Sequence, residues 1–141
     1  MEAVVNIGVS KVLAVLGLVI VVDFITGLLA AKLRPDEVVT SKKWNDGLIR
    51  KGNMVFCSVS CFALDLLIGI DILPYMPFPE TLHRIGFARF GICEAMTLGL
   101  ICGEVKSIIE NWEKAGIVVP EFIKSFIDKL ANLFTSDKGG K

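Results

Sequence analysis

The stretch VLAVLGLVIVVDFITGLLAA, residues 12–31, decides the fold class of this chain. Apart from its glycines, only Asp23 and Thr26 interrupt its apolar character. A helix of about 20 apolar residues is long enough to cross the hydrocarbon core of a bilayer, which is about 30 Å thick. No cluster of Lys or Arg precedes the stretch, and no small-residue cleavage site follows it. We therefore expect a retained transmembrane helix rather than a signal peptide.

Two further apolar blocks follow at residues 54–73 and 86–105, and each is also long enough to span a membrane. A polar segment, residues 32–53, separates the first block from the second. Between the second and third, Pro74, Pro77 and Pro79 exclude a regular helix and predict a short outer turn. The chain is 53% hydrophobic, with a mean hydropathy of +0.64. These features predict a single all-α membrane domain with about three transmembrane helices.

The last part of the chain has a different character. Ala115-Gly116 predicts the end of the third helix, because glycine accepts the left-handed conformation at a helix C-terminus. Pro120 suits the first position of a new helix, and residues 120–134 form an amphipathic pattern. This C-terminal amphipathic helix is predicted either to lie in the membrane interface or to pack against a copy of itself or the loops of its own chain. Residues 135–141 are predicted to be a flexible tail.

The distribution of basic residues predicts the orientation in the membrane, because basic residues concentrate in cytoplasmic loops. Only Lys11 precedes the first block, whereas the segment between the first two blocks carries six basic residues. They are Lys32, Arg34, Lys42, Lys43, Arg50 and Lys51. We therefore expect this basic loop in the cytoplasm, the N-terminus and the Pro-rich turn outside, and the C-terminus in the cytoplasm.

Acidic residues occur near the middle of all three blocks, at Asp23, Asp65 and Glu94. A carboxylate at the bilayer centre costs roughly 2.5–3.5 kcal/mol on insertion scales, so these side chains should face protein or water. In the structural interpretation each acid bonds a neighbouring helix or pairs with Arg89 or Lys51. In the functional interpretation the acids line an aqueous path, or they titrate and control assembly. A polar seam is predicted to continue along one face of the third helix, which carries Glu104, Ser107 and Asn111, and Thr26 lies beside Asp23.

Small residues recur every four positions in the third block, at Gly91, Ala95, Gly99 and Gly103. A shorter stripe, Gly27 and Ala31, occurs in the first block. Such stripes allow close helix packing in lipid, where hydrophobicity does not drive association. The spacing fits both packing within one chain and self-association into a homo-oligomer.

Features of an enzyme are absent from the sequence. It contains no Gly-rich phosphate loop, no Ser/His/Asp set and no HExxH motif, and its one histidine, His83, lies in the Pro-rich turn. The cysteines lie in apolar stretches without a further ligand cluster, so we expect no metal and no cofactor. Formal net charge is zero, which provides no argument for nucleic acid. A non-enzymatic membrane protein is therefore expected.

Two stretches resemble a known family. The first is DFITGLLAA at residues 23–31, followed by the basic GLIRK at residues 47–51. The second is EVKSIIEN at residues 104–111, followed by AGIVVP at residues 115–120. In this order the chain resembles the toxin-secretion/phage-lysis type of phage holin, holin family 4, over about 110 of its 141 residues. Asp65, Asp71 and the Pro-rich turn have no counterpart in that pattern.

The resemblance implies a function. Holins of this type accumulate in the bacterial inner membrane, oligomerise, and open lesions through which an endolysin or a toxin without a signal peptide crosses. The partners implied are further copies of the chain, the lipid bilayer, and an endolysin or toxin that need not be contacted. The alternatives are a small proton- or ion-coupled transporter that uses Asp23, Asp65 and Glu94, and a soluble or peripheral interaction domain.

Overall fold

The computed structural model describes residues 7–34, 40–76, 79–84, 86–87 and 89–134. Over these residues the fold is helical and contains no strand. Three long helices form the body, namely α1 (Ile7–Leu33), α2 (Ser41–Ile68) and α4 (Ile92–Lys114). A 3₁₀ turn, η1 (Leu73–Tyr75), and the short helix α3 (Pro79–Arg84) join α2 to α4 at one end. The last helix, α5 (Glu121–Phe134), packs on α4.

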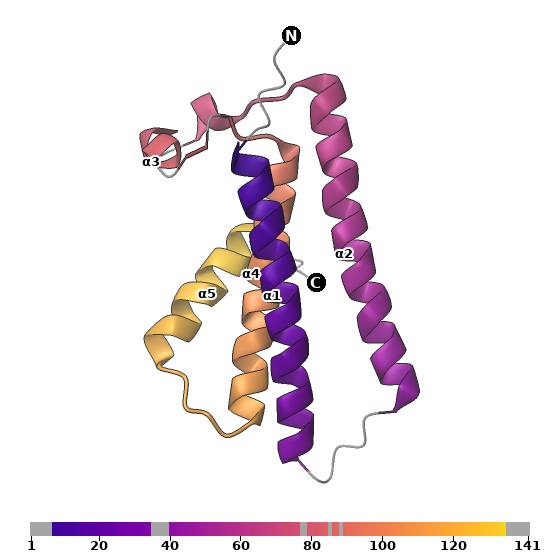
Figure 1. Ribbon diagram of the computed structural model, residues 1–141. Coiled ribbons are helices and arrows are strands. Elements are labelled where there is room, and N and C mark those ends of the chain that lie inside the picture. The colour runs from indigo at the N-terminus through magenta and orange to yellow at the C-terminus, as the bar shows by residue number, and fades with distance from the viewer. Residues whose placement is uncertain (1–6, 35–39, 77–78, 85, 88, 135–141) are drawn as a thin grey trace, which may run out of the picture.

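Helix α4 lies at the centre of this arrangement (Figure 1). It packs most extensively along α1, and it also contacts α2 and α5, whereas α1 and α2 touch each other little. Helices α1 and α4 run in the same direction, and α2 runs in the opposite one (Figure 1). This alternation is the one that three successive membrane crossings require.

The apolar residues of α1 surround the helix instead of forming one stripe. A helix that is apolar on all sides lies either in a protein core or in a membrane. Among the described residues, two segments are long and apolar enough to cross a membrane, Lys11–Leu33 and Trp44–Ile68. Only 17% and 22% of their most apolar windows are buried within the chain. Their apolar character is therefore not explained by a core of this chain alone.

The second helix differs from the prediction. The block predicted at residues 54–73 belongs to a helix that begins thirteen residues earlier, at Ser41, and ends at Ile68. Gly69 adopts a φ of +69° and donates its amide to the Asp65 carbonyl at 2.9 Å, which ends the helix. The prediction that the basic residues lie in a loop was wrong, because Lys42, Lys43, Arg50 and Lys51 all lie on helix α2.

The third helix also begins later than predicted. Residues 86–91 were assigned to a helical block at 86–105, but α4 starts at Ile92 and continues to Lys114. Gly86 has a φ of +97°, and the Ile72 amide bonds the Phe90 carbonyl at 2.8 Å, so this segment turns back against η1. Buried Phe87 and Phe90 pack there with Val12 and Leu73.

The predicted helix end at Ala115-Gly116 is confirmed. Gly116 has a φ of +82°, and its amide bonds the Glu113 carbonyl at 2.9 Å. The amphipathic helix is also confirmed, with its first helical residue at Glu121 and the Pro120 carbonyl accepting the amide of Ile123. The tail predicted at residues 135–141 lies outside the described residues.

Candidate functional site

Three charged side chains that are far apart in sequence meet between α1, α2 and α4. We call Asp23, Lys51 and Glu104 the charged cluster. The Lys51 ammonium donates to Asp23 Oδ2 at 2.7 Å and also pairs with Glu104 Oε2. All three residues are buried, with 5%, 8% and 2% of their surface exposed for Asp23, Lys51 and Glu104. Two carboxylates share one ammonium, so the cluster carries one uncompensated negative charge when all three groups are ionised.

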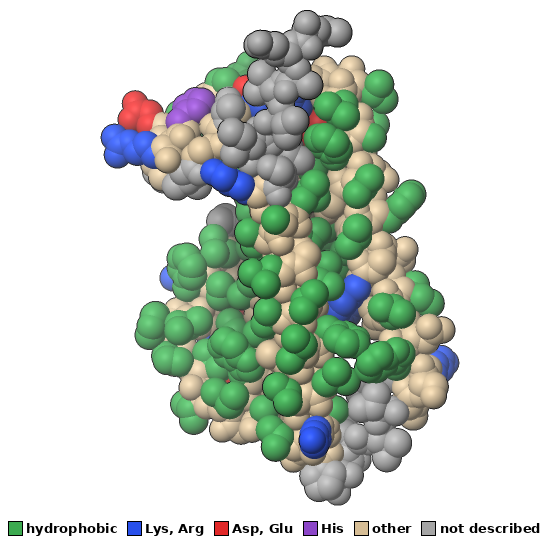
Figure 2. Space-filling model, viewed as in Figure 1, with side chains coloured by type: hydrophobic (Ala, Val, Ile, Leu, Met, Phe, Trp, Pro, Cys, Tyr) green, Lys and Arg blue, Asp and Glu red, His purple; other side chains and the backbone are tan. Residues whose placement is uncertain are grey.

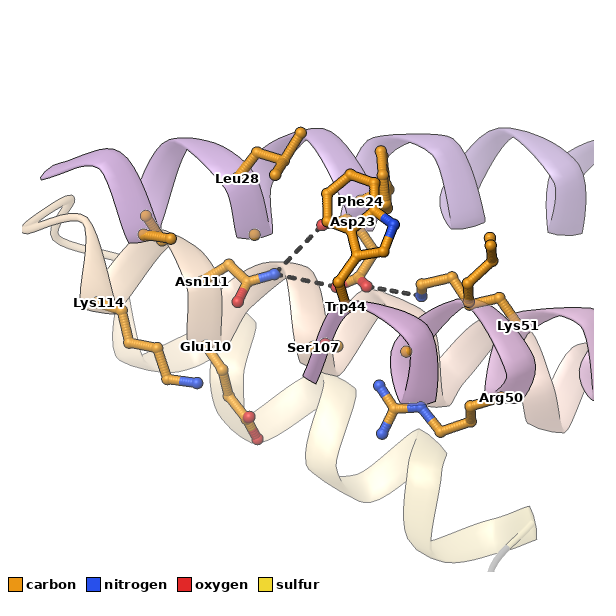
Figure 3. Close-up of a pocket in the computed structure, with 15 residues that line it drawn as sticks. Asp23, Phe24, Leu28, Trp44, Arg50, Lys51, Ser107, Glu110, Asn111 and Lys114 are labelled. Atoms are coloured by element: carbon orange, nitrogen blue, oxygen red, sulfur yellow. Dashed lines mark hydrogen bonds and ion pairs between the residues drawn. The ribbon is translucent and has the colours of Figure 1, made fainter. Parts of the chain in front are cut away.

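Asn111 extends the charged cluster along α4. Its Nδ2 donates to Asp23 Oδ1 at 3.0 Å and lies 3.4 Å from Thr26 Oγ1. Thr26 in turn donates to the Asp23 carbonyl at 3.0 Å. Both oxygens of the Asp23 carboxylate therefore have a partner, one from α2 and one from α4 (Figure 3).

The predicted polar seam of Glu104, Ser107 and Asn111 does lie on one face of α4, directed toward α1 and α2. Glu104 bonds Lys51, and Asn111 bonds Asp23. Ser107 lines the same cavity as Asp23 and Asn111. A Cβ at Gly27 would lie 3.5 Å from Asn111 Nδ2, which is an ordinary van der Waals contact. Gly27 thus packs against α4 of its own chain.

A second group of polar side chains forms where α4 begins, and we call buried Asp65 and Glu94 together with half-buried Arg89 the helix-start cluster. The Asp65 carboxylate on α2 accepts the backbone amides of Ile92 at 3.0 Å and Cys93 at 2.7 Å. The Glu94 carboxylate accepts the Gly91 amide at 2.9 Å. The first amides of a helix have no partner within it, and carboxylates stabilise them both by bonding and by charge.

Arg89 lies three residues before the first residue of α4, Ile92. Its Nη2 donates to the Asp65 carbonyl at 3.4 Å, and its Nε is a buried nitrogen with no hydrogen-bond partner among the described residues. Asp71 ties down the same segment by accepting the amides of Leu73 and Phe90, each at 3.0 Å. The bond from the Phe90 amide is the main cause that lowers the pKa of the Asp71 carboxyl.

The small-residue stripe divides into parts with different environments. Gly91 is the N-cap of α4 rather than a helical residue, and a Cβ there would lie 2.5 Å from Asp65 Oδ2. Gly91 therefore allows the Asp65 carboxylate to reach the helix start. At Gly103, by contrast, a Cβ would meet nothing within 4 Å, and the residue is exposed. This part of the stripe is open on the isolated chain.

Sequence reasoning missed a third set of polar contacts, between the middle of α2 and the first turns of α4. Thr97 donates to Ser58 Oγ at 3.2 Å, and the Cys93 thiol contacts the Ser58 carbonyl at 3.5 Å. All three residues are fully buried. Small polar residues inside an apolar block were the available signal, since such side chains often bond across helices in lipid.

Asp23 and Lys51 of the charged cluster line a cavity of about 370 Å³ that opens between α1, the first turns of α2 and the last turns of α4 (Figure 3). Phe24 and Trp44 form one wall, with their ring centroids 4.9 Å apart. Arg50 and Lys114 lie at its rim. The cavity therefore combines an aromatic wall with charged groups.

The chemistry available here is that of packing and charge. Every acidic carboxylate of the two clusters bonds an amide, an amide side chain or an ammonium. Over the described residues, no group of three or more His, Cys, Asp or Glu side chains could hold a metal ion. The arrangement ties α2 and α4 to each other at both ends of their contact.

The outer surface is apolar where the interior is charged. Figure 2 shows hydrophobic side chains spread over the face formed by the long helices and α5. Large apolar residues of α1 and α2 are strongly exposed, including Leu18, Val21, Phe56, Leu66 and Leu67. Contiguous exposed apolar surface of this extent marks a membrane or a protein interface.

Comparisons with known proteins identify relatives. A family model described as the bacteriophage holin family matches residues 3–132. The holin-like protein TcdE of Clostridioides difficile is 28% identical over 110 residues, which are 74% of this chain and 66% of that protein. The matched part thus spans about two thirds of the length of this curated relative. No solved structure matches the chain.

Proposed function

The chain belongs to the bacteriophage holin family, and from this membership we propose that it accumulates in a bacterial cytoplasmic membrane, assembles with copies of itself and opens lesions. The membership confirms the family that the resemblance indicated. The cargo proposed is an endolysin or a toxin that lacks a signal peptide. It passes through the lesion and need not contact the chain.

One observation supports the proposal beyond family membership. Charged side chains are buried and apolar side chains are exposed, which is the reverse of the distribution in a soluble protein. Asp23, Lys51 and Glu104 are buried between the helices, while the apolar surfaces of α1 and α2 face outward. In lipid this distribution is favourable, because charges are costly against hydrocarbon and apolar side chains are not. It also leaves apolar helix faces available to neighbouring copies.

Three membrane crossings are proposed, with α4 as the third. By composition α4 is more polar than α1, and it carries Glu94 and Glu104 in its interior. Both carboxylates are buried, which removes them from lipid. Because α4 packs along much of α1, a bilayer that surrounds α1 also surrounds α4.

The orientation proposed is N-terminus outside and C-terminus in the cytoplasm. The end of the bundle that holds the α1–α2 connection carries Lys32, Arg34, Lys42, Lys43 and Arg50. Basic residues of this kind remain on the cytoplasmic side of a membrane. Helix α5 returns along α4 from that end, and it is joined there by ion pairs of Lys106 with Asp128 and of Lys124 with Glu113.

A proton- or ion-coupled transporter finds less support in the same geometry. Asp65 and Glu94 bond backbone amides at the start of α4, and Asp23 is engaged by Lys51 and Asn111. A relay needs carboxylates that exchange protons with water, and these groups already have structural partners. We therefore retain the lesion-forming function alone.

Expression in bacteria tests the proposal. The chain is induced while membrane potential and viable counts are followed in the same culture. If the chain is a holin, the culture should grow normally for an interval and then abruptly lose membrane potential and viability. A transporter predicts a sustained culture whose potential changes gradually with expression, and that outcome would contradict the proposal.

A further inference from the structure

The cavity of about 370 Å³ beside the charged cluster has the size of a ligand site. Its three walls come from three helices: the second half of α1, the first turns of α2 and the last turns of α4. The side chains that matter for its chemistry are Phe24, Leu28, Trp44, Arg50, Lys114 and Glu110. None of them belongs to the charged cluster.

The rim of the cavity holds two cations and one acid, beside the charged cluster with its one uncompensated negative charge. Lys51 is already engaged by Asp23 and Glu104, so its ammonium is not available to a ligand. Arg50 and Lys114 also line the cavity, and within the described residues neither side chain makes an ion pair or a hydrogen bond. Arg34 Nε donates to the backbone carbonyl of Lys114 at 2.9 Å, so this bond does not involve the Lys114 ammonium. Glu110 is the one acid at the rim, against these two cations.

The opposite wall is apolar and exposed. Leu28 and Trp44 each expose 42% of their surface, and Trp44 packs edge-on against Phe24. An inorganic anion would contact only the cationic rim and leave this wall in water. A ligand that fills both parts must carry an anionic group joined to a hydrocarbon chain.

The position of the cavity selects among such ligands. It opens at the end of α1 and the beginning of α2, where the proposed orientation places the cytoplasmic leaflet. That leaflet is rich in anionic lipid, and basic pockets between membrane helices on this side bind phospholipid headgroups. This step rests on the proposed membrane function.

We infer that this cavity binds one anionic phospholipid, with its phosphate between Arg50 and Lys114 and its acyl chain along Leu28, Phe24 and Trp44. The chain carries two tryptophans, and Trp112 lies on α4 outside the cavity lining. Trp44 can therefore serve as the reporter of an occupied site once Trp112→Phe removes the other signal.

The test measures quenching of Trp44 by brominated lipids. The full-length Trp112→Phe chain is reconstituted in phosphatidylcholine vesicles that contain increasing brominated phosphatidylglycerol or brominated phosphatidylcholine. We expect the phosphatidylglycerol series to quench at a several-fold lower mole fraction. Arg50→Gln and Lys114→Gln should each reduce this preference about fivefold, since one basic residue near anionic lipid contributes about 1 kcal/mol.

Lys42→Gln is the matched control, because Lys42 lies exposed on the same helix but does not line the cavity. It should change the preference less than twofold. Equal quenching by the two lipids, or an equal loss in Lys42→Gln and Arg50→Gln, would overturn the site and leave only diffuse attraction. Relief of quenching by inorganic phosphate would show that free phosphate is the ligand. Because the readout is lipid contact, it is independent of whether the chain opens lesions.

Discussion

The Lys51 ammonium on α2 lies 2.7 Å from Asp23 Oδ2 on α1, and the same ammonium pairs with Glu104 on α4. One side chain thereby connects three helices, through partners that lie 28 and 53 residues from Lys51 in sequence. In lipid, helices are not held together by a hydrophobic force, so bonds between polar side chains matter for their association.

Lys51→Met should destabilise the packed helices, because it leaves two carboxylates buried without a cation. Removal of one partner from a buried ion pair costs about 3–5 kcal/mol in proteins. Thermal unfolding in detergent should show a clearly lower melting temperature. Lys42→Met, at an exposed position of the same helix, is the control. Addition of Asp23→Asn and Glu104→Gln to Lys51→Met should restore much of the loss, and an unchanged melting temperature in Lys51→Met would refute this role.

Asp65→Leu should weaken the start of α4, because the amides of Ile92 and Cys93 lose their acceptor. Hydrogen bonds to charged groups contribute about 1.5–3 kcal/mol. Amide hydrogen exchange in the first turn of α4 should become faster, while exchange in its last turn should change little. Asp46→Leu, an exposed acid on the same helix, should leave both rates as they are. Uniform acceleration over the whole of α4 would indicate general unfolding instead.

The long helices were predictable from sequence because membrane-spanning composition is a strong signal. Hydropathy, however, reports which residues are apolar and not where a helix ends. Residues 41–53 are polar, yet they continue α2 as a helix beyond the apolar block. Phe87 and Phe90 are apolar, yet they lie in a folded connection before α4.

The candidate site was predictable in its residue types but not in all its partners. An acid within a span indicates a polar neighbour, and Lys51 was one of the two cations predicted as a partner of these acids. That Lys51 serves Asp23 and Glu104 together depends on the packing of three helices. Likewise, Asp65 bonds backbone amides instead of a side chain, and no sequence pattern identifies such a partner.

Gly103→Leu tests whether the open part of the small-residue stripe joins copies of the chain. A Cβ at Gly103 meets nothing within 4 Å, so the substitution should leave the melting temperature of the single chain nearly unchanged. If copies pack there, chemical cross-linking in membranes should give several-fold fewer oligomers. Gly52→Leu, at an exposed position of α2 and equally without a neighbour within 4 Å, is the comparison. A normal oligomer ladder in Gly103→Leu would place the contact elsewhere.

Cysteine labelling tests the proposed orientation. The four native cysteines are first replaced, and a single cysteine is then introduced at Lys42 or at Glu80. A membrane-impermeant thiol reagent applied to intact cells should label position 80 and should not reach position 42 until the cells are opened. The reverse pattern would mean that the chain is inserted the other way round.

Release of a cytoplasmic enzyme tests the central claim most directly. The chain is co-expressed with a cell-wall-degrading enzyme that lacks a signal peptide, and culture turbidity and enzyme activity in the medium are followed together. A lesion-forming holin predicts steady growth, then sudden lysis and release that require both proteins. Cells that lose membrane potential but retain the enzyme and do not lyse would contradict the account, because they would show a pore too small for protein cargo.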